Sequence, residues 1–417
     1  MRILYLAPEN LWPLTTGGHL RVYHLIRETV RYASVSFLGI HNPDESDNLA
    51  PSNDHRLELG LERYVLVAKN RNYTWRKIFR GLIGPTPLPI INYYDSKVAR
   101  ELSLILREQT FDLVQIEHVQ MMGYLSTIRA CRNRPAVVCD WHNIESELMN
   151  RYHRHAGNWA RKLYAGRTAH LLRHLERSLL TACDAHIVVS KRDKSTLQAM
   201  APQASIHVVE NGVDIARYSD GTRPAAPTPV EQAQQKRTDV IFVGSMDFHA
   251  NIDGVVYFCS EIWPRVQALV PELRFVIVGS RPAAEVRDLA RCPGVVVTGT
   301  VDDVMPYYSN ALAAIVPLRV GGGTRLKILE AMAAGVPVVS TSIGAEGLAV
   351  NAGVNILLAD TPEEMTRALV ELHNSYQKWR RLSDTGRELV CTRYDWSVAG
   401  SSLQRIHRGL LDQRAHG

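Results

Sequence analysis

This 417-residue chain lacks several features that mark other classes of protein. No apolar run approaches the roughly 18–20 residues that a membrane-spanning helix needs, which argues against an integral membrane protein. Pro8 and Glu9 stand where a signal peptide would extend its apolar region, so we expect a first strand there instead. The six cysteines are scattered, without C-x-x-C or zinc-type spacing, which suits the reducing cytoplasm.

Ligand-binding signatures of further classes are missing as well. No D-x-D triplet occurs, so we expect no catalytic metal and no other cofactor. Gly17 and Gly18 follow the first apolar run without forming G-x-G-x-x-G, so a dinucleotide-dependent dehydrogenase is poorly supported. Aromatic residues make up only 7% of the chain, which is few for the stacking surface of a nucleic-acid-binding protein.

Positive charge is concentrated in one half of the chain. The net charge is +6, and residues 1–210 carry 27 Lys and Arg against 20 Asp and Glu. The remaining residues carry 21 against 22, so the whole excess lies in the first half. Such an asymmetry indicates that the first half meets an anionic partner: nucleic acid, lipid headgroups or a phosphorylated ligand.

Short apolar runs alternate with segments of helical periodicity, a pattern typical of parallel sheets built from right-handed βαβ units. Strands are predicted in the first half at residues 3–7, 35–40, 112–117, 136–140, 185–190 and 205–209. Strands are predicted in the second half at residues 240–244, 274–279, 295–298, 313–317, 336–340 and 355–358. The main predicted helices lie at residues 19–31, 156–182, 254–269 and 324–334.

The alternation breaks at the sequence N-G-V-D of residues 211–214. A stretch rich in Pro, Ala and Gln follows at residues 220–236 and is predicted to be a linker. We therefore predict two doubly wound α/β domains in tandem, residues 1–210 and residues 211–394.

Two glycine motifs precede predicted helices. Gly17 and Gly18 come before the first helix, where they allow either a plain turn or close approach of an anion to the helix N-terminus. Three glycines at 321–323 precede Thr324, Arg325, Lys327 and Glu330, which are the charged and polar residues around the start of another helix. The glycine N–H groups together with Arg325 and Lys327 suit a diphosphate, and the carboxylate of Glu330 suits the hydroxyls of a ribose.

The second half carries a run, L-E-A-M-A-A-G-V-P-V-V at residues 329–339, that resembles the donor-binding domain of retaining glycosyltransferases of family 4. The G-S-M-D turn at 244–247, G-T-V at 299–301 and G-A-E-G at 344–347 match as well. In the first half, the match includes Gly17-Gly18, His142-Asn143 and the N-G-V-D crossing. The resemblance implies the GT-B fold, two Rossmann-like domains facing across a cleft, with a last helix at about 395–417 crossing back to the first domain.

The resemblance also implies roles for individual residues. Glu330 would bind the ribose, Arg325 and Lys327 would hold the diphosphate as catalytic groups, and the backbone near Val301 would meet the base. His142, at the end of a predicted strand, would contact the donor sugar near the reacting centre. The other implied donor-binding residues are Gly17, Gly18, Gly244, Ser245, Gly321, Gly322, Gly323 and Thr324.

The chain departs from the family pattern at two places. A glutamate usually stands eight residues before the one that matches Glu330, but Gly322 occupies that position here. The loop at residues 244–251 also lacks the usual Arg and Lys. We therefore expect Arg325 and Lys327 to replace that charge, and the identity of the donor sugar stays open.

Residues 151–177 form a basic segment in which Glu176 is the only acid. Tyr164, Leu171, Leu175 and Leu179 recur at near-helical spacing and predict one apolar face. Two interpretations stay open: a helix packed on the core with a basic outer face, or an interfacial helix that meets an anionic membrane surface.

The sequence thus favours a cytoplasmic glycosyltransferase, with peripheral attachment to the inner face of the membrane left open. It would move a sugar, with retention, from a nucleoside-diphosphate sugar to an acceptor such as a glycan or lipid-linked saccharide of cell-surface polysaccharide synthesis. Nucleic acid is not an expected partner. The alternatives are a sugar-nucleotide epimerase of the same fold and a non-catalytic nucleic-acid-binding protein.

Overall fold

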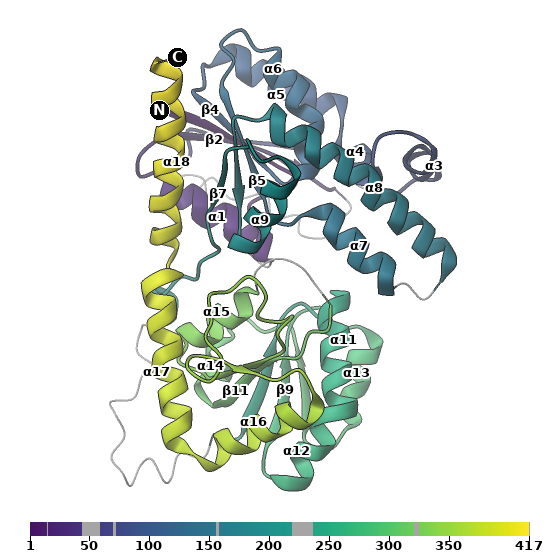
Figure 1. Cartoon of the computed structure of the whole chain (residues 1–417), viewed down its shortest axis with the longest axis vertical. Helices are drawn as coiled ribbons and strands as arrows, with labels where there is room; N and C mark the ends of the chain where they lie inside the picture. The colour runs from purple at the N-terminus through teal and green to yellow at the C-terminus, as the bar shows by residue number, and fades with distance from the viewer. Residues whose placement is uncertain are drawn as a thin grey trace. The chain divides into compact units, whose positions relative to one another are not determined.

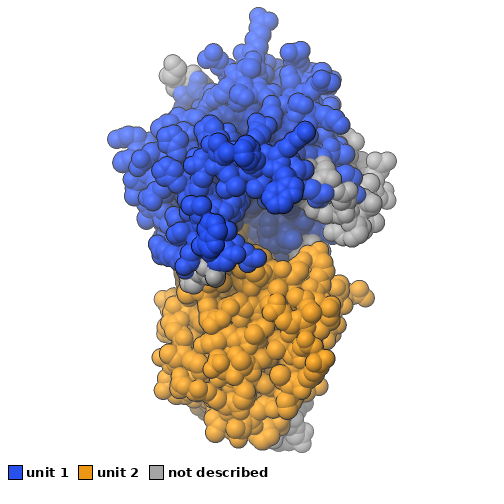
Figure 2. Space-filling view, turned by 90° about the vertical axis from the view of Figure 1, so that its right-hand side faces the viewer, with its two compact units in different colours: residues 1–210, 396–417 blue, residues 211–395 orange. Residues whose placement is uncertain are grey.

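The computed structural model describes residues 1–14, 16–43, 59–69, 72–155, 158–218, 237–320 and 325–416. The predicted linker at 220–236 and the residues Gly321, Gly322, Gly323 and Thr324 therefore lie outside the described residues. The chain divides into two compact units, coloured separately in Figure 2. Unit 1 comprises Met1–Glu210 and Trp396–Gly417, and unit 2 comprises Asn211–Asp395.

Unit 1 is built on a seven-stranded parallel sheet in the order β3-β2-β1-β4-β5-β6-β7. Strands β2, β4, β5 and β7 of this sheet are labelled in Figure 1. Its strands are β1 (Arg2–Ala7), β2 (Ser34–His41), β3 (Arg63–Ala68), β4 (Leu113–Glu117), β5 (Ala136–Trp141), β6 (Ala185–Val188) and β7 (Ile206–Val208). Its helices are α1 (Gly17–Thr29), α3 (Trp75–Ile83), α4 (Leu88–Tyr93), α5 (Ser96–Glu108), α6 (Leu125–Arg129), α7 (Glu145–His155), α8 (Trp159–Ala182), α9 (Lys191–Met200) and α18 (Trp396–His416).

Unit 2 is built on a six-stranded parallel sheet in the order β10-β9-β8-β11-β12-β13. Its strands are β8 (Asp239–Val243), β9 (Arg274–Val278), β10 (Val295–Gly299), β11 (Ala311–Val316), β12 (Val338–Ser340) and β13 (Leu357–Leu358). Its helices are α11 (His249–Tyr257), α12 (Trp263–Leu269), α13 (Ala284–Asp288), α14 (Met305–Ser309), α15 (Leu326–Ala333), α16 (Pro362–Asn374) and α17 (Tyr376–Arg393).

The first strand shows how the sheet of unit 1 obtains two cores. Successive side chains of a strand point to opposite faces, so Leu4 and Leu6 enter one apolar cluster while Ile3 and Tyr5 enter another. Burial of both faces requires a continuous apolar strand rather than an alternating one. This explains why the apolar runs in the sequence predict the central strands well.

The last helix, α18, packs against α1 within unit 1. Gly400 permits the contact, because a Cβ atom at that position would lie 2.4 Å from Cβ of Glu28. At the start of α18, the ring of Trp396 stacks on His24 of α1 at a centroid distance of 4.9 Å. The C-terminal segment is therefore an integral part of unit 1.

The prediction of two doubly wound parallel sheets is confirmed, and the predicted strands agree with the structure to within two residues at each end. Strand β3 was not predicted, nor were the helices α3, α4, α5, α6, α7, α9, α13, α14, α16 and α17. The helix predicted at 254–269 lies within a continuous helical stretch, residues 249–269, in which a π-helical turn at Phe258–Ile262 joins α11 to α12.

Of the predicted apolar face of the basic segment, Leu179 is buried and Tyr164, Leu171 and Leu175 are partly buried. The most buried side of α8 runs beside this face, through Ala165, Thr168, Leu172 and Glu176. No helix within the described ranges combines the length and the apolar character needed to cross a bilayer.

Candidate active site

The carboxyl edge of the sheet in unit 1 gathers charged side chains from two neighbouring strands. Glu117 ends β4 and lies in register with Asp140 of β5, and His142 follows the end of β5 by one residue. Parallel strands end at the same edge of a sheet, which is where ligands collect in open α/β folds. The fold therefore brings the predicted residue His142 beside two carboxylates.

Arg21 of α1 compensates the charge of Asp140. Its Nε and Nη2 atoms donate to Oδ2 and Oδ1 of Asp140, both at 3.0 Å, and its Nη1 donates to the carbonyl oxygen of Val209 at 3.0 Å. The side chains of Arg21 and Asp140 are 1% and 0% exposed, respectively. This is a bidentate ion pair in which the remaining guanidinium nitrogen also has an acceptor. Such a geometry lowers the free-energy cost of burying two charges.

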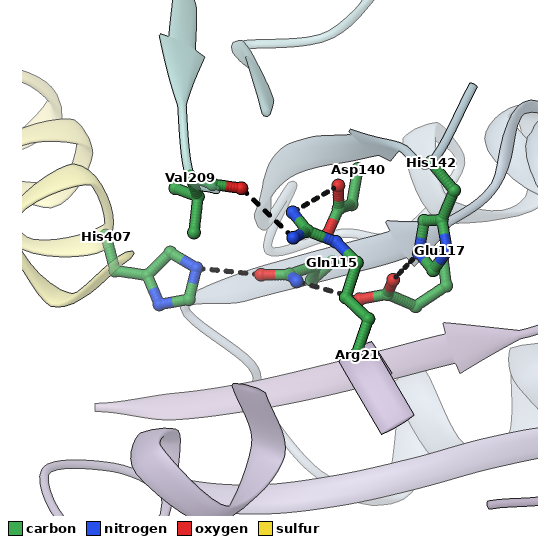
Figure 3. A network of polar contacts seen from close by, with 7 residues as sticks. All are labelled: Arg21, Gln115, Glu117, Asp140, His142, Val209 and His407. Atoms are coloured by element: carbon green, nitrogen blue, oxygen red, sulfur yellow. Dashed lines mark hydrogen bonds and ion pairs between the residues drawn. The ribbon is translucent and has the colours of Figure 1, made fainter. Parts of the chain in front are cut away.

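A chain of polar contacts leads from α18 to His142 (Figure 3). Nε2 of His407 lies 2.9 Å from Oε1 of Gln115, and Nε2 of Gln115 donates to Oε1 of Glu117 at 2.8 Å. Oε2 of Glu117 lies 2.8 Å from Nε2 of His142. These contacts fix the ring of His142 and leave its Nδ1 atom as the nitrogen directed away from the network.

Burial decides the ionisation of this cluster. Burial lowers the pKa of His142 to about 4, so its imidazole is neutral near pH 7. Burial, reinforced by the charge of Asp140, raises the pKa of Glu117 above its ordinary value. A neutral imidazole supplies a hydrogen-bonding group for a sugar hydroxyl without bringing a full charge to the site.

The structure brings Gly18 together with His142. A Cβ atom at Gly18 would lie 3.8 Å from Nε2 of His118 and 4.0 Å from Nδ1 of His142. The two histidine rings lie 3.6 Å apart between centroids. Gly17 is the first residue of α1, so the glycine pair and His142 line the same part of unit 1.

Glu117, Asp140 and His142 offer one ligand atom each within 4.8 Å of one another, a spacing that could hold a metal ion. The guanidinium of Arg21 already occupies both oxygens of Asp140, and Gln115 donates to Glu117. A cation would have to displace these partners. The absence of a catalytic metal therefore stays a prediction.

In unit 2, Lys327 of α15 lies against the end of β8. Its Nζ donates to Oδ1 of Asn251 at 2.8 Å and lies 3.9 Å from the ring centroid of Phe242. A Cβ atom at Gly244 would stand 2.8 Å from the same Nζ, so a larger residue there would displace the ammonium group. The structure thus brings together Lys327 and Gly244, two of the predicted donor-binding residues.

The ammonium of Lys327 is in an unfavourable environment for a charge. Burial, followed by the nearby charge of Arg325, lowers the pKa of Lys327 to about 7, while Glu330 opposes this shift. Burial raises the pKa of Glu330, and Arg217 and Lys327 counteract it. Arg325, Lys327 and Glu330 are therefore close enough to influence one another at the start of α15.

The loop after β8 is held by close backbone packing. A Cβ atom at Gly279 would lie 1.7 Å from the carbonyl oxygen of Gly244. Oγ of Ser245 lies 3.2 Å from Oγ of Ser280, and Nδ2 of Asn251 donates to the carbonyl oxygen of Ser245 at 2.8 Å. Val301 lies two residues beyond β10 and packs against the core of unit 2.

Several site residues were not found from the sequence. Arg21 and Gln115 lie more than 90 residues from one or more of their partners, so no local motif marks them. Glu117 had a usable signal, because it ends a predicted strand next to the one that ends near Asp140. Asn251 could have been suspected as the polar residue of the loop that lacks the family's usual cations.

Comparison with known proteins identifies the class of this fold. Sucrose-phosphate synthase from Thermosynechococcus elongatus superposes with a TM-score of 0.73 at 17% identity, covering 99% of this chain and 100% of that chain. An Anabaena protein in complex with UDP-glucose superposes with a TM-score of 0.63 at 15% identity, covering 98% and 100%. The fold is that of the GT-B glycosyltransferases.

Sequence comparisons identify the family. Residues 49–217 match the model described as "Glycosyltransferase Family 4", and residues 237–375 match "Glycosyl transferases group 1". The chain belongs to these group 1 glycosyltransferases of family 4, and it is an enzyme of the glycosyltransferase type.

Two curated relatives illustrate the range of the family. A mannosyltransferase of Mycobacterium tuberculosis, named as GDP-mannose-dependent and acting on phosphatidylinositol monomannoside, is 27% identical over 51% of this chain and 58% of its own length. An uncharacterised protein of the cps region of Klebsiella pneumoniae is 22% identical over 40% of this chain and 45% of its own length. The chain thus spans about half the length of these relatives.

Proposed function

We propose that this glycosyltransferase moves a sugar from a nucleoside-diphosphate sugar to a glycan or lipid-linked acceptor, with retention of anomeric configuration. The Anabaena relative was solved with UDP-glucose and the mycobacterial relative is named for GDP-mannose, which supports a nucleotide-sugar donor. Cell-surface polysaccharide synthesis is the proposed setting, in line with the relative from the Klebsiella cps region.

The environment of Lys327 is the observation that carries the donor site. Its ammonium contacts the neutral Asn251 and the ring of Phe242, and within the described residues it forms no ion pair. A partly buried ammonium with a pKa of about 7 gains stability when an anion arrives. Arg325 and Lys327 would bind the diphosphate, and Glu330 would accept hydrogen bonds from the ribose hydroxyls.

These residues would act on the leaving group. Negative charge grows on the diphosphate as the glycosidic bond breaks, so fixed cations stabilise the transition state more than the bound donor. His142, neutral and oriented by Glu117, would hold a hydroxyl of the donor sugar. Because Arg325 and Lys327 supply the charge, we propose that turnover needs no metal ion.

A screen of sugar nucleotides by thermal shift tests the proposal. A ligand at 100 times its dissociation constant adds about 2.7 kcal/mol of stability to the folded state. NMR of the product formed from the best donor then reads the anomeric configuration, in buffer with and without EDTA. Conversion of the donor without any acceptor would instead favour an epimerase, and inversion at the anomeric carbon would contradict the proposed mechanism.

A further inference from the structure

Helix α3 presents its apolar side to solvent. Trp75, Phe79 and Ile83 are spaced four residues apart, so they share one face of the helix. Their exposed fractions are 86%, 63% and 66%. Surface helices of globular proteins normally turn the apolar face inward, so this orientation needs a reason.

The inward side of α3 is held in place by small and polar groups. Gly81 is buried, and a Cβ atom there would lie 2.8 Å from Cβ of Leu88. Lys77 turns inward, and its Nζ donates to Oδ1 of Asn92 at 2.9 Å and to the carbonyl oxygen of Asn72 at 3.0 Å. These contacts fix the outward direction of Trp75, Phe79 and Ile83.

The first turns of α8 extend the same apolar surface. Trp159 and Leu163 lie one turn apart on α8 and are 79% and 65% exposed. Nη2 of Arg167 donates to the carbonyl oxygens of Ile83 and Gly84 at 3.1 Å and 3.0 Å, which joins α8 to the end of α3. We call Trp75, Phe79, Ile83, Trp159 and Leu163 the α3–α8 surface.

The charged residues of α3 and of the first turns of α8 are all basic. Arg76 and Arg80 on α3, and Arg161 and Lys162 on α8, are exposed beside it. Helix α3 carries no acidic residue, and the single acid of α8, Glu176, is buried where it accepts from Ser146 N. The flank of the surface is therefore complementary to an anionic partner.

A basic cavity lies further along the same helix. It has a volume of about 440 Å³ between α7, α8 and α9. Five arginines line it: Arg151, Arg154, Arg173, Arg177 and Arg192. Glu147 also lines it and accepts from Nη2 of Arg192 at 2.9 Å. Positive charge thus continues from the α3–α8 surface along the exposed side of α8.

We propose that the α3–α8 surface docks unit 1 on an anionic lipid bilayer. Tryptophan and phenylalanine favour the boundary between headgroups and acyl chains, and Arg and Lys beside them meet anionic headgroups. An amphipathic helix with this distribution lies in the plane of the interface, with its apolar side in the lipid. A lipid-linked acceptor lies at such a bilayer, so the purpose of the surface rests on the proposed function.

Vesicle binding tests the docking surface without any sugar nucleotide. The full chain is sedimented with vesicles of mixed phosphatidylcholine and phosphatidylglycerol, and with vesicles of phosphatidylcholine alone. We expect binding to the anionic vesicles, weaker binding to neutral ones, and a decrease with salt. Brominated lipid should quench the emission of Trp75 and Trp159, since the other five tryptophans are buried or partly buried.

Paired variants make the test specific. Trp75→Ser with Phe79→Ser should lower vesicle affinity at least about tenfold, because both side chains leave water on binding. Leu269→Ser, which changes a 64% exposed leucine of unit 2, is the matched control and should bind like the unaltered protein. Circular dichroism and sugar-nucleotide binding should be unchanged in both variants.

Three outcomes would overturn the docking proposal: no binding to anionic vesicles, equal affinity of the Trp75/Phe79 variant, or self-association through α3 that excludes vesicles. The last would identify a second copy of the chain as the occupant. Each is distinguishable from failure of the transferase proposal, which is measured by donor binding in the absence of lipid.

Discussion

The two units bury charge in different ways. In unit 1, Arg21 pairs through two hydrogen bonds with Asp140 and donates a third to Val209. In unit 2, Lys327 contacts a neutral amide and an aromatic ring, and its pKa falls to about 7. We expect a charge with internal partners to serve the fold, and a cation that forms no ion pair in the described part of unit 2 to serve ligand binding.

This difference assigns separate tasks to the two sites. The network from His407 to His142 orients a neutral imidazole, and its members are satisfied before any substrate arrives. In the proposed function, the cations at the start of α15 gain their electrostatic stabilisation only when the donor binds. Substitutions should therefore affect stability in unit 1 and donor binding in unit 2.

The largest expected effect is the loss of stability in Arg21→Met. Asp140 would stay buried without a countercharge, which costs about 3–5 kcal/mol. The matched control is Arg319→Met, because Arg319 also forms two hydrogen bonds with one carboxylate, Asp253, but the two side chains are 52% and 34% exposed. A solvent-exposed pair contributes about 0–1 kcal/mol.

Urea unfolding of both variants measures this contrast. Adding Asp140→Leu to Arg21→Met should recover much of the loss, since no unpaired charge then stays buried. Similar losses of stability in Arg21→Met and Arg319→Met would contradict the distinction between the buried pair of unit 1 and an exposed surface pair.

Removal of the cations of unit 2 should impair turnover rather than folding. Each charge-assisted contact with the diphosphate contributes about 1.5–3 kcal/mol, so Arg325→Ala and Lys327→Ala should each lower kcat/KM by roughly 10-fold to 150-fold. Arg325→Lys should restore little of the lost kcat/KM, because a lysine ammonium cannot reproduce the several hydrogen bonds that a planar guanidinium donates. Steady-state kinetics with the donor found in the screen, and circular dichroism for folding, make the measurement.

Near-normal kcat/KM in both Arg325→Ala and Lys327→Ala would mean that other residues bind the diphosphate. The same variants should unfold at the urea concentration of the unaltered protein. A large loss of stability would mean that these cations, like Arg21, serve the fold.

A smaller effect is expected from Glu330→Gln. The change keeps one hydrogen-bond acceptor for the ribose but removes the charge, so donor affinity should fall by about tenfold, or about 1.4 kcal/mol. Isothermal titration calorimetry with the sugar nucleotide measures it. Unchanged affinity would remove Glu330 from the donor site while leaving the role of Lys327 intact.

Sequence reasoning found the residues that share a short stretch of chain. Arg325, Lys327 and Glu330 lie within six residues on α15 and its approach, and Gly18 and His142 each follow a strand. Arg21, Gln115 and His407 were missed because their partners come from distant elements, and only the tertiary fold makes them neighbours.

Local periodicity described two helices incompletely. Helix α3 was missed because its nine residues carry an apolar face too short to stand out as a periodic pattern. The apolar face predicted for α8 lies beside its most buried side, because Ala165 and Ala169 add little to an apolar pattern although they are buried. Local periodicity thus located α8 and the approximate side that packs.

The most direct test of the central claim is the uptake of a proton by Lys327 when the donor binds. With a pKa of about 7, Lys327 is mostly neutral at pH 8 in the free protein, and a bound diphosphate should raise that pKa. Calorimetry at pH 8 in buffers of different ionisation enthalpy should show uptake of up to about 0.9 proton per sugar nucleotide, with affinity falling as pH rises above 7. Lys327→Met should abolish the uptake, and the exposed-lysine control Lys97→Met should retain it. Donor binding without proton uptake, or equal uptake in Lys327→Met, would contradict the claim that this lysine receives the diphosphate.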